Sequence, residues 1–308
     1  MQDALKLMVL AGGPDRERAV SLNSGAAVAQ ALTTAGHEVI TCDLTPDDTT
    51  ALNRFQAEAH HAIFPTLHGP WGEGGGMQAL LDQRGIPYVG SQTQAAALAM
   101  NKDQAKQVFI KQGLTTPASV VLGKDQRREA IQTPCVVKPI DEGSSVHLSI
   151  CHTPKEAEHA LNQAFKEHDA MLVETYIAGR ELTCGVLNTG PGAYALPPIE
   201  IRPADGAYDY DAKYLRDDTD YLFNTLDPSI QTQVQEQAVE AHRALGCRDL
   251  SRTDFILSET GVLYVLETNT LPGFTDHSLL PKSAEEAGLP MPQLCDTMVR
   301  WAIARHDA

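Results

Sequence analysis

The sequence predicts an α/β protein of two or three domains. Its 308 residues are roughly twice the length of a usual single domain. Hydrophobic residues make up 43% and charged residues 21% of the chain, a balance typical of folded globular proteins rather than disordered ones. The first third alternates short apolar runs with helical patterns, which predicts a parallel sheet covered by helices.

The elements of the first 91 residues alternate in this way along the chain. We expect strands over 5–11, 38–42, 61–65 and 87–89, with helices over 21–35 and 77–84. Ligands collect at the carboxyl ends of parallel strands, where the loops 12–17 and 66–76 lie. Both loops are therefore candidate site segments.

The rest of the chain divides at Ala178-Gly179, a predicted hinge, into units 92–177 and 178–308. In the central unit we expect helices over 101–112 and 154–168 and strands at Val120, 135–139, 146–150 and 171–174. In the last unit we expect strands over 182–187 and 195–202, a polar stretch over 203–222, and a helix from Asp227-Pro228 to Gly246.

The net charge argues against two classes of partner. Lysine and arginine number 24 against 40 aspartates and glutamates, which gives a formal charge of −16. This field repels phosphate backbones and anionic lipid headgroups, so we expect neither nucleic-acid nor membrane binding. The apolar stretch Leu7 to Ala11 is far shorter than the roughly 20 residues of a membrane span, and no signal-peptide cleavage pattern follows it. We therefore expect a cytoplasmic protein.

The cysteines and most histidines show no metal-ligand spacing. The six cysteines are scattered without a C-x-x-C pair, which favours buried, reduced thiols over a disulfide framework or a zinc site. We expect His60, His61, His152, His159 and His168 on the surface or in loops.

The sharpest local signal lies between Arg252 and Asn269. A two-residue turn at Thr260-Gly261 would pair the flanking strands so that Asp254 lies directly opposite Glu267. Arg252 would share the face of Asp254, and Asn269 that of Glu267. Opposed carboxylates repel unless a cation separates them, and oxygen ligands of this kind suit Mg²⁺ held with phosphates. The alternative is a salt-bridge network around Arg252.

Lys138 marks a candidate phosphate site. It ends the apolar run Val136-Val137 and precedes Glu142-Gly143-Ser144-Ser145, a small flexible loop that could place backbone N–H groups around phosphate oxygens. An ordinary turn is the alternative. Neither a GxGxxG nor a GxxxxGK[ST] motif occurs, so dinucleotide-binding and P-loop folds lose their main support.

Taken in order, these motifs resemble those of D-alanine–D-alanine ligases. The motifs are Gly12-Gly13, ERAVSLNSG to Gly25, LHG at 67–69, VVKP at 136–139, EGSSV at 142–146, YDYDAKY at 208–214, SRTD at 251–254 and LETNTLPGFTDHSL at 266–279. The resemblance spans nearly the whole chain. It implies an ATP-grasp fold with an N-terminal parallel-sheet domain and central and C-terminal units of α+β type, with ATP held between the latter two. It also implies a homodimer.

The resemblance also implies the roles of individual residues. ATP would contact Lys102, Lys138, Ser145 and Lys213 through its phosphates, Glu174 and Ile177 at adenine, and Glu181 at the ribose. Magnesium or manganese, two ions in all, would be held by Asp254, Glu267 and Asn269. The catalytic set would be Glu17, Ser144, Tyr214, Arg252 and Gly273, and D-alanine would also meet His68, Ser278 and Leu279. The stretch 203–222 would form a closing lid.

The implied chemistry joins two D-alanine molecules, with ATP first converting one carboxylate to an acyl phosphate. A related ligase with D-serine, D-lactate or another acceptor is the second hypothesis, and a catalytically dead nucleotide-binding protein is the third. Four positions of this chain depart from the family pattern. Gly74 and Asn101 stand where the pattern has Asp, Asp141 stands where it has Arg, and His147 stands where it has Gly.

Overall fold

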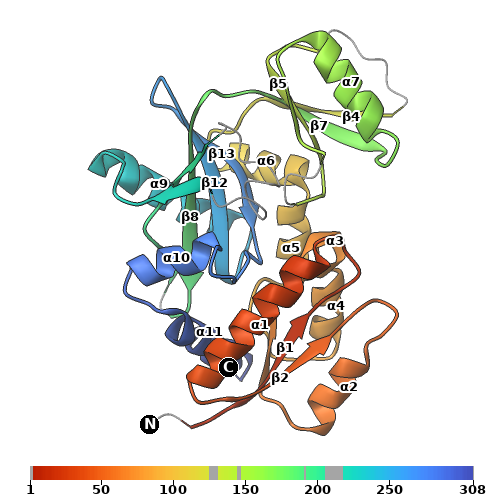
Figure 1. Cartoon of the computed structure of the whole chain (residues 1–308), viewed down its shortest axis with the longest axis vertical. Coiled ribbons are helices and arrows are strands. Elements are labelled where there is room, and N and C mark those ends of the chain that lie inside the picture. Colours follow the sequence, from red (N-terminus) through yellow and green to blue (C-terminus); the bar gives the residue numbers. More distant parts are fainter. Residues whose placement is uncertain (1–2, 125–130, 144–146, 191, 205–217, 308) are drawn as a thin grey trace.

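A computed structural model describes residues 3–124, 131–143, 147–190, 192–204 and 218–307 of the chain. Within these ranges, three sheets follow one another along the sequence, with helices packed on them (Figure 1). The first sheet is parallel, whereas the strand pairs of the other two are antiparallel. The predicted order of a parallel-sheet unit followed by two units of α+β type is confirmed.

The N-terminal sheet has the strand order β2-β1-β3. Its region contains β1 (Lys6–Ala11), α1 (Arg18–Thr34), β2 (Glu38–Asp43), α2 (Thr50–Ala57), β3 (Ala62–Pro65), α3 (Gly69–Gly72) and α4 (Gly76–Gln83). The fourth strand expected over 87–89 is wrong, because Tyr88 makes only an isolated parallel bridge to Ile63. The chain then turns away at Gly90, whose φ of +107° favours glycine.

Helix α1 packs closely on β1 because its buried face carries small side chains. Ser21, Ser24, Gly25 and Val28 repeat at helical spacing and are buried. A Cβ at Gly25 would lie 2.5 Å from the Cβ of Ala11, so only glycine permits this approach. The helix begins three residues earlier than expected, which places Glu17 at its N-cap position.

The N-terminal sheet shares its hydrophobic core with the end of the chain. Two helices follow the last strand, α10 (Leu279–Glu286) and α11 (Met291–His306). One buried cluster joins Leu7 and Phe64 of the sheet to Leu294 and Met298 of α11. Helix α11 lies beside α1 in Figure 1. Residues 1–91 therefore do not enclose their core alone.

The central sheet has the order β4-β7-β5-β6. Its region contains α5 (Thr93–Met100), α6 (Lys102–Lys111), β4 (Ser119–Gly123), β5 (Cys135–Pro139), β6 (Ser149–Cys151), α7 (Pro154–Ala164) and β7 (Ala170–Thr175). Asn101 caps α6 by accepting the Gln104 N–H at 3.0 Å. Helix α7 has Thr153 as its cap and Pro154 at its first position, and it ends four residues before the expected His168.

The C-terminal sheet has the order β11-β10-β8-β12-β13, with β9 paired to β8. Its region contains β8 (Gly179–Asn188), β9 (Tyr194–Ala195), β10 (Ile199–Pro203), β11 (Thr219–Leu222), α9 (Pro228–Ala244), β12 (Asp249–Ser258) and β13 (Leu263–Asn269). The single strand expected over 195–202 is two strands, because Pro197-Pro198 interrupts the hydrogen-bonded ladder.

The predicted pairing of Asp254 with Glu267 is confirmed, but the predicted turn is wrong. Near the turn Leu257 pairs with Leu263, so the connection is longer than two residues, and Gly261 takes a φ of +81° there. A shift in register between Asp254 and Phe255 then adds one residue on β13. The longer turn moves the strand pairing by one residue and the bulge moves it back, so Asp254 still lies opposite Glu267.

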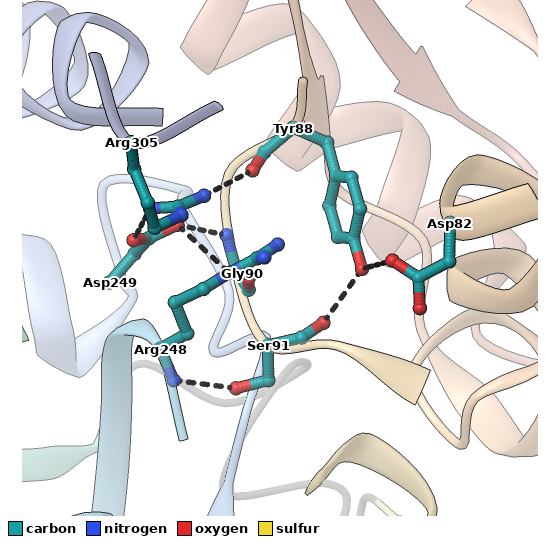
Figure 2. Close-up of polar contacts among 7 residues, drawn as sticks. All are labelled: Asp82, Tyr88, Gly90, Ser91, Arg248, Asp249 and Arg305. Atoms are coloured by element: carbon teal, nitrogen blue, oxygen red, sulfur yellow. Dashed lines mark hydrogen bonds and ion pairs between the residues drawn. The ribbon is translucent and has the colours of Figure 1, made fainter. Parts of the chain in front are cut away.

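A polar network joins the end of the N-terminal region to the C-terminal sheet (Figure 2). Asp249, at the start of β12, is fully buried and accepts the Gly90 N–H at 2.8 Å. Arg305 of α11 pairs with Asp249 and donates to the Tyr88 carbonyl at 3.1 Å. Arg248 donates to the Gly90 carbonyl at 2.7 Å. This network fixes β12 relative to the N-terminal sheet.

The cysteines are free thiols, and five of the six are buried, as expected; Cys42 is half-buried. No helix in the described ranges combines the length and apolar character needed to cross a membrane.

Candidate active site

A pocket lies between the central and C-terminal sheets. It is bounded by β5 and β7 on one side and by β8, β12 and β13 on the other. Seven of the predicted site residues line it: Lys102, Lys138, Glu174, Ile177, Glu181, Asp254 and Glu267. Apolar side chains complete the lining, including Val136, Ile150, Leu182 and Ile201. A mixture of apolar walls and a few charged groups is typical of a site for a small ligand.

Lys138 is buried at the end of β5 and paired with Glu174 of β7. Its Nζ lies 2.6 Å from Oε1 of Glu174. Burial opposes the charge on Lys138, but Glu174 and Glu267 outweigh burial and raise the pKa of the lysine. Burial also opposes the ionised form of Glu174, yet Lys138 and Lys106 lower its pKa. Both groups of the pair are therefore charged.

Lys106 belongs to the same network, although no sequence motif singled it out. Its Nζ donates to Oε2 of Glu174 and to Oγ1 of Thr116, each at 2.8 Å. Burial is the main reason that the pKa of Lys106 is lowered. Lys106 follows Lys102 by four residues in α6, so the two share a helix face. That spacing is the signal that could have found it.

Lys102 lies where the pocket meets a second, smaller cavity. Its Nζ donates to the backbone carbonyl of Glu142 and lies 3.8 Å from Oε2 of Glu267. Burial lowers the pKa of Lys102, while Glu267 opposes that shift. A buried cation at this junction favours an anionic ligand.

The predicted metal ligands meet on one face of the β12–β13 hairpin. Asp254 accepts two hydrogen bonds from Arg252, each at 2.9 Å, and one from Thr183 Oγ1 at 2.6 Å. The Asn269 amide donates to Asp254 at 3.3 Å, and Glu267 pairs with Asp254 across the strands. The salt bridge around Arg252, which was the alternative to a metal site, is thus present, and the side-chain oxygen atoms of Asp254, Glu267 and Asn269 lie beside it. Oxygen donors alone fit a hard cation such as Mg²⁺.

The smaller cavity extends toward the N-terminal sheet and contains further carboxylates. Glu73, Gly143 and Asn269 line it. A Cβ at Gly143 would lie 3.4 Å from Glu17 Oε2 and 3.5 Å from Glu73 Oε1. Burial, followed by the nearby charge of Glu17, raises the pKa of Glu73 well above its usual value. The family resemblance implies a role for Glu17 but none for Glu73.

His68 is buried in the loop after β3. Burial, and to a lesser degree the charge of Arg252, lowers its pKa to about 4, so the imidazole is neutral at pH 7. Its Nε2 has no hydrogen-bond partner among the described residues. Asp15 positions this loop by accepting the N–H groups of Trp71 and Gly72 at 3.2 and 3.1 Å. The two candidate loops of the N-terminal sheet are thereby linked.

Gly273 and Ser278 lie side by side in the segment after β13. A Cβ at Gly273 would lie 2.8 Å from Ser278 Oγ, so a larger residue would displace the serine. Ser278 Oγ accepts the Thr275 N–H at 2.9 Å. The Leu279 side chain is buried with Ile199, so only its backbone remains for a ligand.

Four predicted site residues, Ser144, Ser145, Lys213 and Tyr214, lie outside the described residues, as does most of the predicted lid. Of the departures from the family pattern, Gly74 has a steric reason. A Cβ at Gly74 would lie 2.2 Å from the carbonyl oxygen of Pro70. Asn101 keeps the capping role that aspartate would have. Asp141 is exposed, and His147 contacts His168.

Comparison with known proteins identifies the family. The family model described as "D-ala D-ala ligase C-terminus" matches residues 103–300. The chain belongs to the D-alanine–D-alanine ligase family. This confirms the resemblance, the ATP-grasp fold and the class of ATP-dependent ligases. The alternative acceptors are not favoured.

Curated relatives and solved structures agree over nearly the whole chain. The chain is 40% identical over 303 residues to the D-alanine–D-alanine ligase of Syntrophotalea carbinolica, with 97% of each chain covered. It is 42% identical to that of Saccharophagus degradans, covering 94% of this chain and 91% of the relative. The ligase of Bacillus anthracis has a TM-score of 0.86 at 31% identity, and its complex with ATP has 0.84 at 28%, each covering 99% of both chains.

Proposed function

We propose that the pocket between the two sheets holds ATP and that the smaller cavity holds D-alanine, so that the chain forms D-alanyl-D-alanine for peptidoglycan precursors. The observation that carries this proposal is the position of Lys102, which lines both cavities and faces Glu267. A cation at this junction is suited to a phosphoryl group passing from one ligand to the other.

Lys102 and Lys138 neutralise phosphate oxygens of ATP. Ile177 and the segment after β7 contact adenine, and Glu181 accepts the ribose hydroxyls. The Glu174 carboxylate is already held by two lysines, so its part is to position Lys138 rather than to contact the base. Ser145 and Lys213 complete the phosphate contacts in the family pattern, but both lie outside the described residues.

Asp254, Glu267 and Asn269 would hold Mg²⁺ or Mn²⁺, since their side chains meet on one face of the β12–β13 hairpin beside both cavities. Two ions are proposed, from the family resemblance. When bound, such ions neutralise charge on the transferring phosphate.

The reaction has two balanced steps. A carboxylate oxygen of the first D-alanine attacks the γ-phosphorus and ADP leaves. The amine of the second D-alanine then attacks the resulting acyl phosphate, and inorganic phosphate leaves. Arg252 and the Gly273 N–H stabilise the negative oxygen formed in the second step.

The substrate side uses residues from both ends of the chain. Glu17 accepts hydrogen bonds from the ammonium group of the first D-alanine, and the neutral His68 contacts the same substrate. Ser278 and the Leu279 backbone bind the carboxylate of the second D-alanine. Ser144 and Tyr214 would close the site together with the lid over 203–222, and this part rests on the family resemblance alone.

Three further proposals concern the whole molecule. The chain divides into units 1–91, 92–177 and 178–308, although the first shares its core with the last. It acts in the cytoplasm, where ATP is available. It forms a homodimer, and a sedimentation run that shows only particles of 33.3 kDa would exclude this.

The deciding experiment measures phosphate release and dipeptide formation together. We expect D-alanine, ATP and Mg²⁺ to yield one phosphate for each D-alanyl-D-alanine. D-Serine and D-lactate should be poor acceptors when offered beside D-alanine. Phosphate release that requires another acceptor, or that occurs without dipeptide, would contradict the proposal.

A further inference from the structure

Two histidines that the proposed reaction does not use meet beside the central sheet. His147 Nδ1 lies 2.9 Å from His168 Nε2. His147 follows the predicted phosphate loop, and His168 lies between α7 and β7. The chain folds β6 and α7 between them, which is why sequence spacing gave no sign of their contact.

Glu142 completes the group. Its Oε2 lies 3.9 Å from His147 Nδ1 and 3.8 Å from His168 Nε2. The same oxygen is buried and has no hydrogen-bond partner among the described residues. An oxygen in that state is costly unless a cation or proton satisfies it. Two imidazole nitrogens and one carboxylate oxygen thus lie within 4.8 Å of one another.

The backbone of His147 is a second, independent observation. Its φ is +55°, a left-handed conformation that L side chains rarely adopt. Glycine would adopt it without strain, but this chain has a histidine there. A residue keeps such a conformation only where the surrounding structure holds it in place, and here that conformation positions the His147 ring against His168.

We propose that Glu142, His147 and His168 form a binding site for Zn²⁺ or a similar transition-metal ion, separate from the magnesium site on the β12–β13 hairpin. Two histidines and a glutamate are a known zinc ligand set, with water in the fourth position. Tetrahedral ligands about 2.0–2.1 Å from zinc lie roughly 3.3 Å apart. The three separations in this structure, 2.9, 3.8 and 3.9 Å, lie on both sides of that value.

The surroundings fit a metal site as well. His147 Nε2, the nitrogen that is not a ligand, lies 3.7 Å from Oε1 of Glu167. Arg16 of the N-terminal region pairs with the same glutamate at 2.5 Å. At that distance Glu167 does not accept a hydrogen bond from the ring, but its negative charge favours a cation nearby.

The site has a consequence for the neighbouring pocket. The Glu142 backbone carbonyl accepts the hydrogen bond from Lys102, and Gly143 follows directly. A bound ion would tie this segment to the α7–β7 connection. We expect zinc to raise the midpoint of thermal unfolding, because the ion binds only the folded arrangement.

The test is a calorimetric titration of the metal-stripped full chain with Zn²⁺ in excess Mg²⁺, which fills oxygen sites. One equivalent of Zn²⁺ should bind. His147→Gly and His168→Ala should each abolish this Zn²⁺ binding. His147→Gly should fold well, because glycine adopts the left-handed conformation without strain. His159→Ala, which removes an exposed histidine of α7, should still bind one equivalent of Zn²⁺.

Circular dichroism would establish that both variants are folded, and Co²⁺ absorption would report nitrogen ligands in the wild type. The proposal is overturned if the wild-type chain retains no Zn²⁺ after dialysis. It is equally overturned if folded His147→Gly and His168→Ala bind zinc as the wild type does.

Discussion

Lys138 Nζ lies 2.6 Å from Oε1 of Glu174, and both side chains are buried. The second oxygen of Glu174 lies 2.8 Å from Lys106 Nζ. One carboxylate of β7 therefore balances two buried lysines, one on α6 and one on β5. This arrangement makes Glu174 a structural counter-ion as well as part of the pocket wall.

Replacing Glu174 with glutamine should destabilise the fold and weaken ATP binding together. The change keeps the shape but removes the charged partner that Lys106 and Lys138 share, and leaves both lysines buried. Breaking a buried ion pair from one side costs about 3 kcal/mol or more. Urea unfolding would measure the loss in the free energy of unfolding, and the KM for ATP should rise.

Lys106→Met provides the matched control, because it removes one buried cation and leaves the Lys138 pair intact. We expect Glu174→Gln to cost less in the Lys106→Met background than in the wild type. Equal costs in the two backgrounds would show that Lys106 and Glu174 do not interact energetically.

Arg252→Lys should lower turnover by roughly 100-fold, the size of effect seen when one oxyanion donor is lost. A lysine cannot reproduce the two hydrogen bonds that the guanidinium makes to Asp254. The matched control is Arg180→Lys, which breaks a similar two-point pair with Glu200 elsewhere in the same sheet. Its turnover should stay near that of the wild type, and an equal fall in both variants would remove the special role of Arg252.

Glu267→Gln should preserve the fold and shift the Mg²⁺ dependence of the reaction. The amide keeps the shape of the side chain but removes a charged oxygen ligand, so more Mg²⁺ is needed and turnover falls. Chelating the metal from the wild-type enzyme should abolish activity, and adding Mg²⁺ should restore it. A Glu267→Gln curve that overlays the wild type at every Mg²⁺ concentration would contradict the metal assignment.

The hairpin shows what sequence reasoning could predict and how it succeeded. The alternation of side chains and the turn signal at Gly261 placed Asp254 opposite Glu267, as the structure has it. The assumed turn was too short by one residue, and the bulge corrected the error. Turn chemistry is local and visible in sequence, whereas a bulge depends on how the strand meets its neighbours.

Contacts made through the fold were the part that sequence could not predict. Lys106 has a spacing signal relative to Lys102, but its partner Glu174 comes from another element. His147 and His168 meet only because β6 and α7 fold back between them. Such pairs have no periodicity to reveal them, since their separation depends on tertiary packing.

The stability of the chain should fall as the solution becomes acidic, and His242 should contribute. Burial, followed by the charge of Arg243, lowers the pKa of His242 to about 4, compared with 6.5 in an unfolded chain. Between these values the unfolded chain binds a proton that the folded chain does not. Above pH 6.5 His242 is neutral in both states and does not oppose folding. As the pH falls from 6.5 toward 4, the free energy of unfolding decreases by up to about 3 kcal/mol.

His242→Asn should flatten this pH dependence while keeping a partner for Ser251, which lies 2.8 Å from His242 Nδ1. Urea unfolding across the window between pH 6.5 and about 4 would measure it. The variant will be less stable throughout, so the slope against pH is the quantity of interest. Equal slopes for wild type and His242→Asn would contradict the prediction.

Asp249 should be among the most costly acidic residues to neutralise. Its carboxylate is fully buried between Arg305 and the Gly90 N–H, at the junction shown in Figure 2. Asp249→Asn removes the charge and keeps the size, and asparagine tolerates the residue's φ of +63°. We expect a loss of about 3 kcal/mol in the free energy of unfolding, because Arg305 keeps its charge without its partner.

Asp82→Asn is the matched comparison, since Asp82 belongs to the same network but is exposed, accepting a hydrogen bond from Tyr88 at 2.8 Å. An exposed carboxylate contributes about 1 kcal/mol or less, so this variant should unfold near the wild-type urea concentration. Asp249→Ala would add backbone strain to the loss of charge and should be less stable than Asp249→Asn. Two aspartate-to-asparagine variants of equal stability would mean that the buried pair at Asp249 does not hold β12 to the N-terminal sheet.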